Sequence, residues 1–249
     1  MDLLIDIGNS RLKWATHDES GAGLEWSYSE PILHGGDYQA CIASLWGGLR
    51  QPDRVALCCV AASQAAHSVI ERVESLWGLE VRQLTNLDTA YDITSNYAFG
   101  ELGVDRWLAV IGARKLSAGD LAIADFGSAV NIEFLASDNQ YLGGMILPGR
   151  ALLHHSLVAG TAMEVDDLAP FSGQLGDSTQ TAISAGVHGA LTGALEKAIQ
   201  FAEKQHKREW RVIITGGDAS MLASYLSEEY TLEPHLVFIG MQEVLNWQG

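Results

Sequence analysis

Basic residues are scarce in this chain of 249 amino acids, in which 15 lysines and arginines stand against 31 aspartates and glutamates. The resulting formal charge of −16 repels phosphate backbones and anionic lipids, so we expect neither nucleic acid nor a membrane among the partners. No apolar run approaches the ~20 residues that cross a bilayer. The first residues read directly as a strand and not as a signal peptide, which predicts a cytoplasmic protein.

Cysteine is scarce as well, and Cys41, Cys58 and Cys59 show no metal-binding spacing. We expect buried, reduced thiols and no zinc site. A Walker-type phosphate loop, which joins a glycine-rich run to Lys-Ser or Lys-Thr, is also absent from the sequence. Any ATP site in this chain must therefore use a different phosphate-binding arrangement.

One short phrase is present twice. Asp6-Ile7-Gly8-Asn9-Ser10 ends one apolar run, and Asp125-Phe126-Gly127-Ser128 ends another. Each copy reads as a buried strand that carries an aspartate into a glycine turn with a hydroxyl group. A carboxylate, a hydroxyl and closely approaching backbone N–H groups suit a metal-bound polyphosphate, so two facing copies would form a clamp. For either copy alone, an ordinary strand and turn is an equally good interpretation.

The hydropathy pattern predicts an α/β chain made of two similar halves, 1–118 and 119–249. With 47% hydrophobic and 18% charged residues, the chain is expected to be globular throughout. Each half begins with three strands and continues with alternating helices and strands. The predicted strands are 3–7, 12–16, 24–28, 55–60, 81–84, 121–125, 130–135, 140–146, 211–214 and 236–239. The predicted helices are 38–49, 65–77, 105–116, 151–158, 182–205 and 221–227.

Taken in order along the whole chain, the motifs resemble those of the type III pantothenate kinases, in the superfamily of acetate and sugar kinases, Hsp70 and actin. The residues that carry the resemblance are 6–13, Gly103-Val104-Asp105-Arg106, 125–129, Gly143-Gly144, Pro148-Gly149, Ser178-Thr179 and 216–219. The resemblance implies a duplicated ribonuclease H-like (actin-like) fold, with a mixed sheet flanked by helices in each half. It also implies phosphoryl transfer from ATP to pantothenate, giving 4′-phosphopantothenate in the first step of coenzyme A synthesis. Mg²⁺, a monovalent cation (K⁺ or NH₄⁺) and a homodimer are implied with it.

The same resemblance suggests roles for individual residues. Asp105 is expected as the general base, Asp125 as the ligand of the monovalent cation, and Asp6 as a ligand of Mg²⁺. The ATP phosphates and adenosine are expected at Asp6, Gly8, Asn9, Ser10, Lys13, Ser128, Gly216 and Gly217. Pantothenate is expected at Tyr97, Gly103, Val104, Asp105, Arg106 and Thr179. The residues alone allow a plainer interpretation, in which Asp105 caps a helix beside an exposed Arg106 and Lys13 is a solvated strand residue.

Several positions depart from the family pattern. Ser128 replaces threonine and keeps its hydroxyl group. Asn131 replaces threonine and Glu133 replaces aspartate, which leaves the preference for the monovalent cation open. No proline follows Tyr97, and Ser178 replaces asparagine. Two alternatives are an accessory factor for transcription and a kinase for another small hydroxyl compound. The acidic charge counts against DNA contact, and the intact aspartates and Lys13 count against an inactive enzyme.

Overall fold

Two sheets with the same strand order organise the chain in the computed structural model, which describes residues 1–18, 25–35, 37–98, 100–163, 165, 167–227 and 229–247. Each sheet lies in its own unit. The first unit comprises Met1–Ile93, Tyr97–Lys115 and Leu236–Gly249, and the second comprises Thr94–Asn96 and Leu116–His235. The C-terminal segment therefore packs in the unit that contains the N-terminus, although the sequence pattern places it in the half 119–249.

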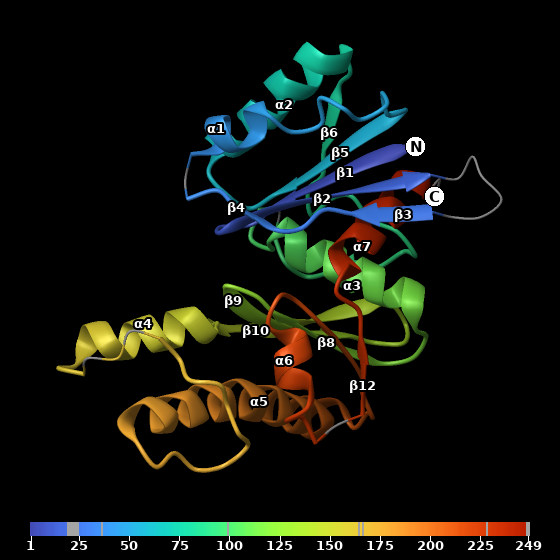
Figure 1. Cartoon of the computed structure of the whole chain (residues 1–249). Helices are drawn as coiled ribbons and strands as arrows, with labels where there is room; N and C mark the ends of the chain where they lie inside the picture. Colours follow the sequence, from blue (N-terminus) through green and yellow to red (C-terminus); the bar gives the residue numbers. More distant parts are fainter. Residues whose placement is uncertain are drawn as a thin grey trace. The chain divides into compact units, whose positions relative to one another are not determined.

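The first sheet has the order β3-β2-β1-β5-β6, with β4 beside β2 (Figure 1). β1 is antiparallel to β2 and parallel to β5. The strands are β1 (Asp2–Ile7), β2 (Arg11–Asp18), β3 (Glu25–Tyr28), β4 (Ile32–Leu33), β5 (Arg54–Cys59) and β6 (Val81–Gln83). The helices of this unit are α1 (Tyr38–Ala43), α2 (Ser63–Trp77), α3 (Val104–Leu116) and α7 (Leu236–Asn246).

Alternation along β1 gives the first sheet two different faces. Leu3, Ile5 and Ile7 are fully buried in a core shared with α1 and α2. Asp2 and Asp6 lie on the opposite face, where α7 packs against β1 and where Figure 1 also shows α3. The period of the strand thus directs Asp6 toward the helix that carries Asp105.

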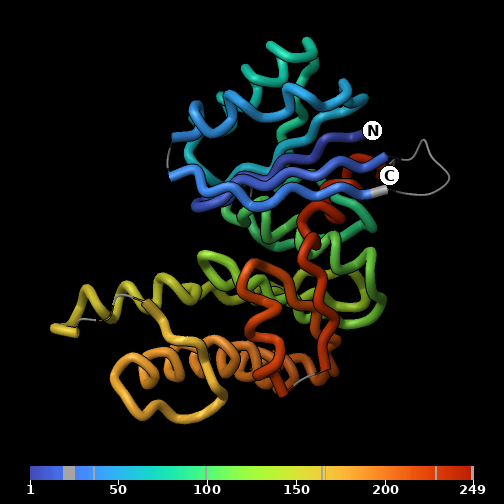
Figure 2. The backbone as a smooth tube through the Cα atoms, viewed as in Figure 1, coloured from blue at the N-terminus to red at the C-terminus, as the bar shows by residue number. Residues whose placement is uncertain are grey.

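The apolar run 236–239 predicts a final strand, and this prediction is wrong, because these residues form the first turn of α7. A run of four apolar residues does not distinguish a strand from a buried helix. Tertiary contacts decide the outcome, since a Cβ atom at Gly240 would lie 1.9 Å from the carbonyl oxygen of Leu108 in α3. The amide of Gln242 also donates to Asp2 Oδ2 at 2.9 Å, which ties α7 to β1, as the adjacent red and blue tubes in Figure 2 show.

Two smaller predictions also differ from the structure. The helix predicted over 38–49 ends at Ala43, and Trp46 adopts a left-handed backbone with φ of 62° that a helix cannot continue through. The strand β12 (Tyr230–Leu232) was not anticipated, because its three residues are all exposed and carry no alternating pattern. The predicted strand over 24–28 is present as β3, except that Leu24 lies outside the described residues.

The second sheet has the order β12-β11-β8-β9-β10-β7 and so repeats the connectivity of the first. β8 is antiparallel to β9 and parallel to β11, as β1 is to β2 and β5. Its remaining strands are β7 (Thr94–Ser95), β8 (Leu121–Phe126), β9 (Ala129–Leu135), β10 (Gln140–Pro148) and β11 (Arg211–Thr215). The helices of this unit are α4 (Arg150–Gly160), α5 (Thr179–His206) and α6 (Ala219–Ala223).

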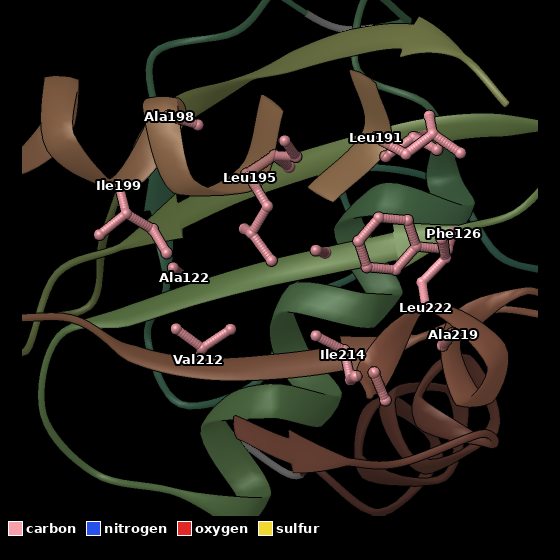
Figure 3. Close-up of a cluster of buried hydrophobic side chains, with 14 of the residues drawn as sticks. Ala122, Phe126, Leu191, Leu195, Ala198, Ile199, Val212, Ile214, Ala219 and Leu222 are labelled. Carbon is pink, nitrogen blue, oxygen red and sulfur yellow. The ribbon is translucent and has the colours of Figure 1, made fainter. Parts of the chain in front are cut away.

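The long helix α5 covers one face of the second sheet. Figure 3 shows Leu191, Leu195 and Ile199 of this helix against the buried side chains of β8 and β11, with Leu222 of α6 closing one end. Burial of this kind stabilises a fold by ~25 cal/mol for each Å² of apolar surface removed from water. The turns that follow β8 and β11 are therefore held by a packed core. No helix of the described residues is long and apolar enough to span a bilayer.

Candidate active site

The first turn connects β1 to β2 and is closed by the N–H of Gly8, which donates to the carbonyl oxygen of Arg11 at 3.0 Å. Asn9 is exposed at its tip, and Nε2 of the buried His34 lies 3.1 Å from the Gly8 carbonyl oxygen. A Cβ atom at Gly8 would meet only the Arg11 carbonyl oxygen, at an ordinary 3.6 Å. The hairpin itself does not require glycine here, so the open space in front of Gly8 is available to a ligand.

Two carboxylates and a lysine meet in the first unit. Asp6 pairs across the strands with Lys13 and in parallel with Cys58. Burial raises the pKa of Asp6 to about 6, Lys13 opposes this increase, the charge of Asp105 adds to it, and a hydrogen bond with Cys58 opposes it. Asp6 and Asp105 therefore interact although they are far apart in sequence. Asp6 offers hard oxygen donors beside a second negative charge, and this setting fits a Mg²⁺ ion.

The cysteines are free, as expected, and they differ in burial. Cys58 is fully buried, whereas Cys41 and Cys59 are half-buried. Burial, together with the nearby Asp6 and Asp105 charges, raises the pKa of the Cys58 thiol. Cys58 consequently stays protonated and can donate a hydrogen bond to Asp6, a contact that the sequence pattern alone does not reveal.

The acceptor motif opens α3. Asp105 lies in the first helical turn, and its Oδ1 accepts a hydrogen bond from the Arg106 N–H at 2.8 Å. A Cβ atom at Gly103 would lie 2.7 Å from this Oδ1, so glycine makes room for the folded-back carboxylate. Arg106 is only 9% exposed, and its guanidinium carbon lies 5.8 Å from the centre of the Tyr97 ring. The plainer interpretation with an exposed Arg106 is therefore wrong.

The second and third turns lie together in the second unit. In the sheet, Asp125 is paired with Asn131 of β9 on one side and with Thr215 of β11 on the other. Gly216 has a φ of 96°, and a Cβ atom there would lie 2.4 Å from Asp125 Oδ1, so only glycine fits beside the aspartate. The Asp218 N–H donates to the Phe126 carbonyl oxygen at 3.0 Å and fastens one turn to the other.

Ser128, Pro148 and Gly149 complete the same region. The Gly149 N–H donates to the carbonyl oxygen of the exposed Ser128 at 3.0 Å. A Cβ atom at Gly149 would lie 2.2 Å from the Gly127 carbonyl oxygen, which accounts for glycine at this position. Gly217 is exposed next to Gly216. The structure thus brings Asp125, Ser128, Gly216 and Gly217 into one region, as the motifs predict.

Asn131 and Glu133 of β9, which depart from the family pattern, lie in different environments. Asn131 and Asp125 are directly opposite in the antiparallel pair and share one face of the sheet. Glu133 is 2% exposed, and its Oε2 accepts a hydrogen bond from the Tyr141 hydroxyl at 2.5 Å. Among the described residues, no group of three or more His, Cys, Asp or Glu side chains could hold a metal ion. A monovalent cation at Asp125 would therefore need amide or backbone oxygens, of which Asn131 is the nearest amide by register.

Thr179 is the first residue of α5, and its side chain is exposed. The preceding residue, Ser178, caps the helix, because its hydroxyl accepts from the Thr181 N–H at 3.3 Å. Thr179 belongs to the second unit, whereas Tyr97 and Arg106 belong to the first. Sequence reasoning also missed Arg150, which directly follows the Pro148-Gly149 motif and opens α4. A basic residue adjoining a glycine turn in so acidic a chain is the signal that could have identified it.

These features define a fold class. The fold is a duplicated ribonuclease H-like (actin-like) fold with an aspartate turn at the corresponding place in each half. A family model described as "Type III pantothenate kinase" matches residues 2–200. The chain belongs to this family, as the motifs predict.

Relatives in several bacteria support this assignment over the full length of the chain. Type III pantothenate kinases of Methylibium petroleiphilum and Chromobacterium violaceum are each 33% identical and cover 99% of this chain, with 99% and 100% of their own lengths matched. A third, from Halorhodospira halophila, is 34% identical over 99% of this chain and 97% of its own length. The chain is thus a member of an enzyme family of kinases.

Two solved structures are similar in fold. A "conserved putative Baf family transcriptional activator" from Campylobacter jejuni has a TM-score of 0.62 at 19% identity, with 98% of this chain and 97% of that chain covered. A "putative 2-dehydro-3-deoxygalactonokinase protein" from Sinorhizobium meliloti also has a TM-score of 0.62, at 14% identity, with coverages of 99% and 96%. At these identities the likeness concerns the fold alone, and neither title bears on the activity of this chain.

Proposed function

We propose that this chain transfers the γ-phosphoryl group of ATP to the primary hydroxyl of pantothenate and so forms 4′-phosphopantothenate. The observation that carries the proposal is the meeting of Asp6, Asp105 and Lys13 in the first unit, next to a buried Arg106. Phosphoryl transfer requires mainly positioning and charge neutralisation, with proton removal late in the reaction. The family membership of the chain specifies pantothenate as the acceptor.

In the proposed reaction, Asp105 orients the acceptor hydroxyl and accepts its proton as the bond to phosphorus forms. Gly103 supports this role, since its missing side chain leaves space for the Asp105 carboxylate. Arg106 binds the carboxylate of pantothenate, because a guanidinium group can form two parallel hydrogen bonds to it. Tyr97 lies against Arg106 and restricts its orientation, and Val104 is a further proposed contact of pantothenate in this unit. Thr179 is the contact proposed for the second unit.

The phosphates are bound by the glycine turns. Asn9, Ser10 and Ser128 supply polar side chains, and Gly8, Gly216 and Gly217 let the nucleotide approach the backbone. Lys13 adds positive charge. Asp6 would hold Mg²⁺, whose charge offsets that of the phosphates, and Asp125 would hold K⁺ or NH₄⁺ with oxygen ligands nearby.

A second copy of the chain is the proposed partner. The second unit exposes several apolar side chains along β10, along α4 and just beyond it: Met145 (38%), Ile146 (62%), Leu152 (49%) and Met163 (38%). Large exposed apolar patches often mark protein interfaces. We assign it to a homodimer, and we place the enzyme in the cytoplasm because its three cysteines are free.

The decisive experiment measures whether ADP release depends on pantothenate. Turnover is measured with pantothenate, with pantothenol, which lacks the carboxylate, and without acceptor, and the product is identified by mass spectrometry. We expect ADP release and phosphopantothenate only with pantothenate, and a large loss of this selectivity in Arg106→Gln. Phosphorylation of both acceptors at equal rates would contradict the assignment of Arg106, and no pantothenate-dependent ADP would contradict the proposed reaction.

The same assay tests the monovalent cation. Asp125 is expected to support much faster turnover in K⁺ or NH₄⁺ than in Na⁺, which is smaller and more tightly hydrated. Equal rates in all three salts would remove the cation from the proposal and leave the phosphoryl transfer unaffected.

A further inference from the structure

The two halves of the duplicated fold differ in the charge beside their aspartate turns. In the first unit, the aspartate at the end of the strand is paired with a lysine, because Asp6 is opposite Lys13 in the antiparallel ladder. In the second unit, Asp125 is opposite Asn131, which is neutral. The second turn therefore lacks the basic side chain that the first turn has across from its aspartate.

Arg150 lies where it can supply this missing charge. It is the only basic residue in the three segments that form the region, 126–129, 148–150 and 215–219. It follows Gly149, whose N–H is bonded to the carbonyl oxygen of Ser128 in the second turn. Its Nε lies 3.4 Å from Oδ1 of Asp218, which belongs to the third turn.

The contacts of Arg150 leave its terminal amino groups available. The ion pair with Asp218 uses Nε, an atom that is buried and forms no hydrogen bond in the described part of the chain. The side chain as a whole is 34% exposed, and it forms no other hydrogen bond or ion pair with the described residues. Asp218 thus orients the guanidinium group, while its two terminal amino groups remain able to donate to a ligand.

We propose that Arg150 binds a phosphate group of the nucleotide at the second turn and takes the place there that Lys13 has at the first. The inference rests on the proposed binding of ATP at this turn. An arginine suits this task because its planar donors match the spacing of two phosphate oxygens. The pairing with Asp218 keeps the guanidinium in place before the nucleotide arrives, which reduces the entropy lost on binding.

Binding of ATP, ADP and adenosine to the purified full chain tests the proposal by calorimetry in the presence of Mg²⁺. We expect Arg150→Gln to weaken ATP binding by about 10- to 100-fold, the range for a hydrogen bond to a charged group, and to leave adenosine binding unchanged. Arg150→Lys is expected to restore part of the affinity. The matched control is Arg208→Gln, which removes a similar ion pair, to Asp120 at 2.7 Å, at the opposite end of β8.

A further variant separates direct binding from positioning. If Arg150 contacts phosphate, Asp218→Asn retains or increases the affinity for ATP, because a competing negative charge is removed. If Asp218→Asn weakens ATP binding as much as Arg150→Gln does, Arg150 acts only through the third turn and the proposal is overturned. An equal loss of adenosine affinity in Arg150→Gln would also overturn it, since the damage would then not concern phosphate.

Ser128→Ala, measured in parallel, distinguishes failure of this inference from failure of the proposed nucleotide site. Weaker ATP binding in Ser128→Ala, together with wild-type binding in Arg150→Gln, refutes the role of Arg150 and leaves the site in place. Unchanged binding in both variants refutes the placement of ATP at this turn.

Discussion

The buried carboxylate of Asp6 is expected to lower the free energy of unfolding although activity requires it, and Asp6→Asn tests this. Burial raises the pKa of this carboxyl from 3.8 to about 6. At about 1.4 kcal/mol for each pKa unit, the charged form is disfavoured in the folded state by ~3 kcal/mol. Asp6→Asn keeps the shape of the side chain and removes the charge, so we expect the variant to be more stable by up to this amount near pH 7.5 and to lose turnover.

The sign of the pH dependence follows from the same shift. Between about pH 4 and pH 6 the folded state holds a proton on Asp6 that the unfolded state has lost. The contribution of Asp6 to stability is therefore complete below its ordinary pKa and is lost as the pH rises through about 6. The difference in unfolding free energy between Asp6→Asn and the wild type should grow over this interval and be constant above it.

Asp2, on the same strand and the same face, provides a matched control of opposite sign. Burial raises the pKa of Asp2, but hydrogen bonds from Arg54 and Gln242 outweigh it, and the pKa lies below its ordinary value. Asp2→Asn should therefore destabilise the protein near neutral pH by ~1–3 kcal/mol. Urea unfolding of both variants and the wild type from pH 4 to pH 8 measures the effects. A loss of stability in Asp6→Asn at pH 7.5 would refute the reasoning.

Three further predictions concern turnover, ATP binding and stability. Lys13→Ala should raise the KM for ATP about tenfold or more, since the proposed role of this half-buried lysine is electrostatic. Unchanged kinetics would exclude the first turn from the mechanism. Asp105→Asn should lower kcat by about 10²- to 10⁴-fold and retain ATP binding, which calorimetry measures. Turnover within a few-fold of the wild type would show that another residue is the base. Gly8→Ala should fold normally and bind ATP poorly, whereas Gly216→Ala should lose stability because its Cβ atom would overlap Asp125. Thermal melting followed by circular dichroism distinguishes the two variants. Normal ATP binding by Gly8→Ala would contradict a close approach of the nucleotide to the first turn.

Local patterns account for the parts of the fold that were predicted correctly. The strands β1, β8 and β11 are apolar runs ending in glycine turns, and α5 is long enough for its helical period to be clear. The sequence pattern predicts a strand in place of α7, because the apolar run becomes a helix only through contact with α3 at Gly240. The sequence pattern does not predict β12, because this exposed edge strand is held by backbone pairing with β11, which does not affect the hydropathy pattern.

The sequence by itself determined which residues could do chemistry, since a carboxylate, a lysine and a glycine turn have the same capabilities wherever they lie. It also determined most of the succession of strands and helices along the chain, because hydropathy and turn residues act over short distances. The tertiary structure alone decided that Asp105 raises the pKa of Asp6, that Gly216 fits against Asp125, and that Arg150 reaches Asp218. Each of these contacts joins segments far apart in sequence, and their approach depends on strand pairing and helix packing that no local pattern encodes.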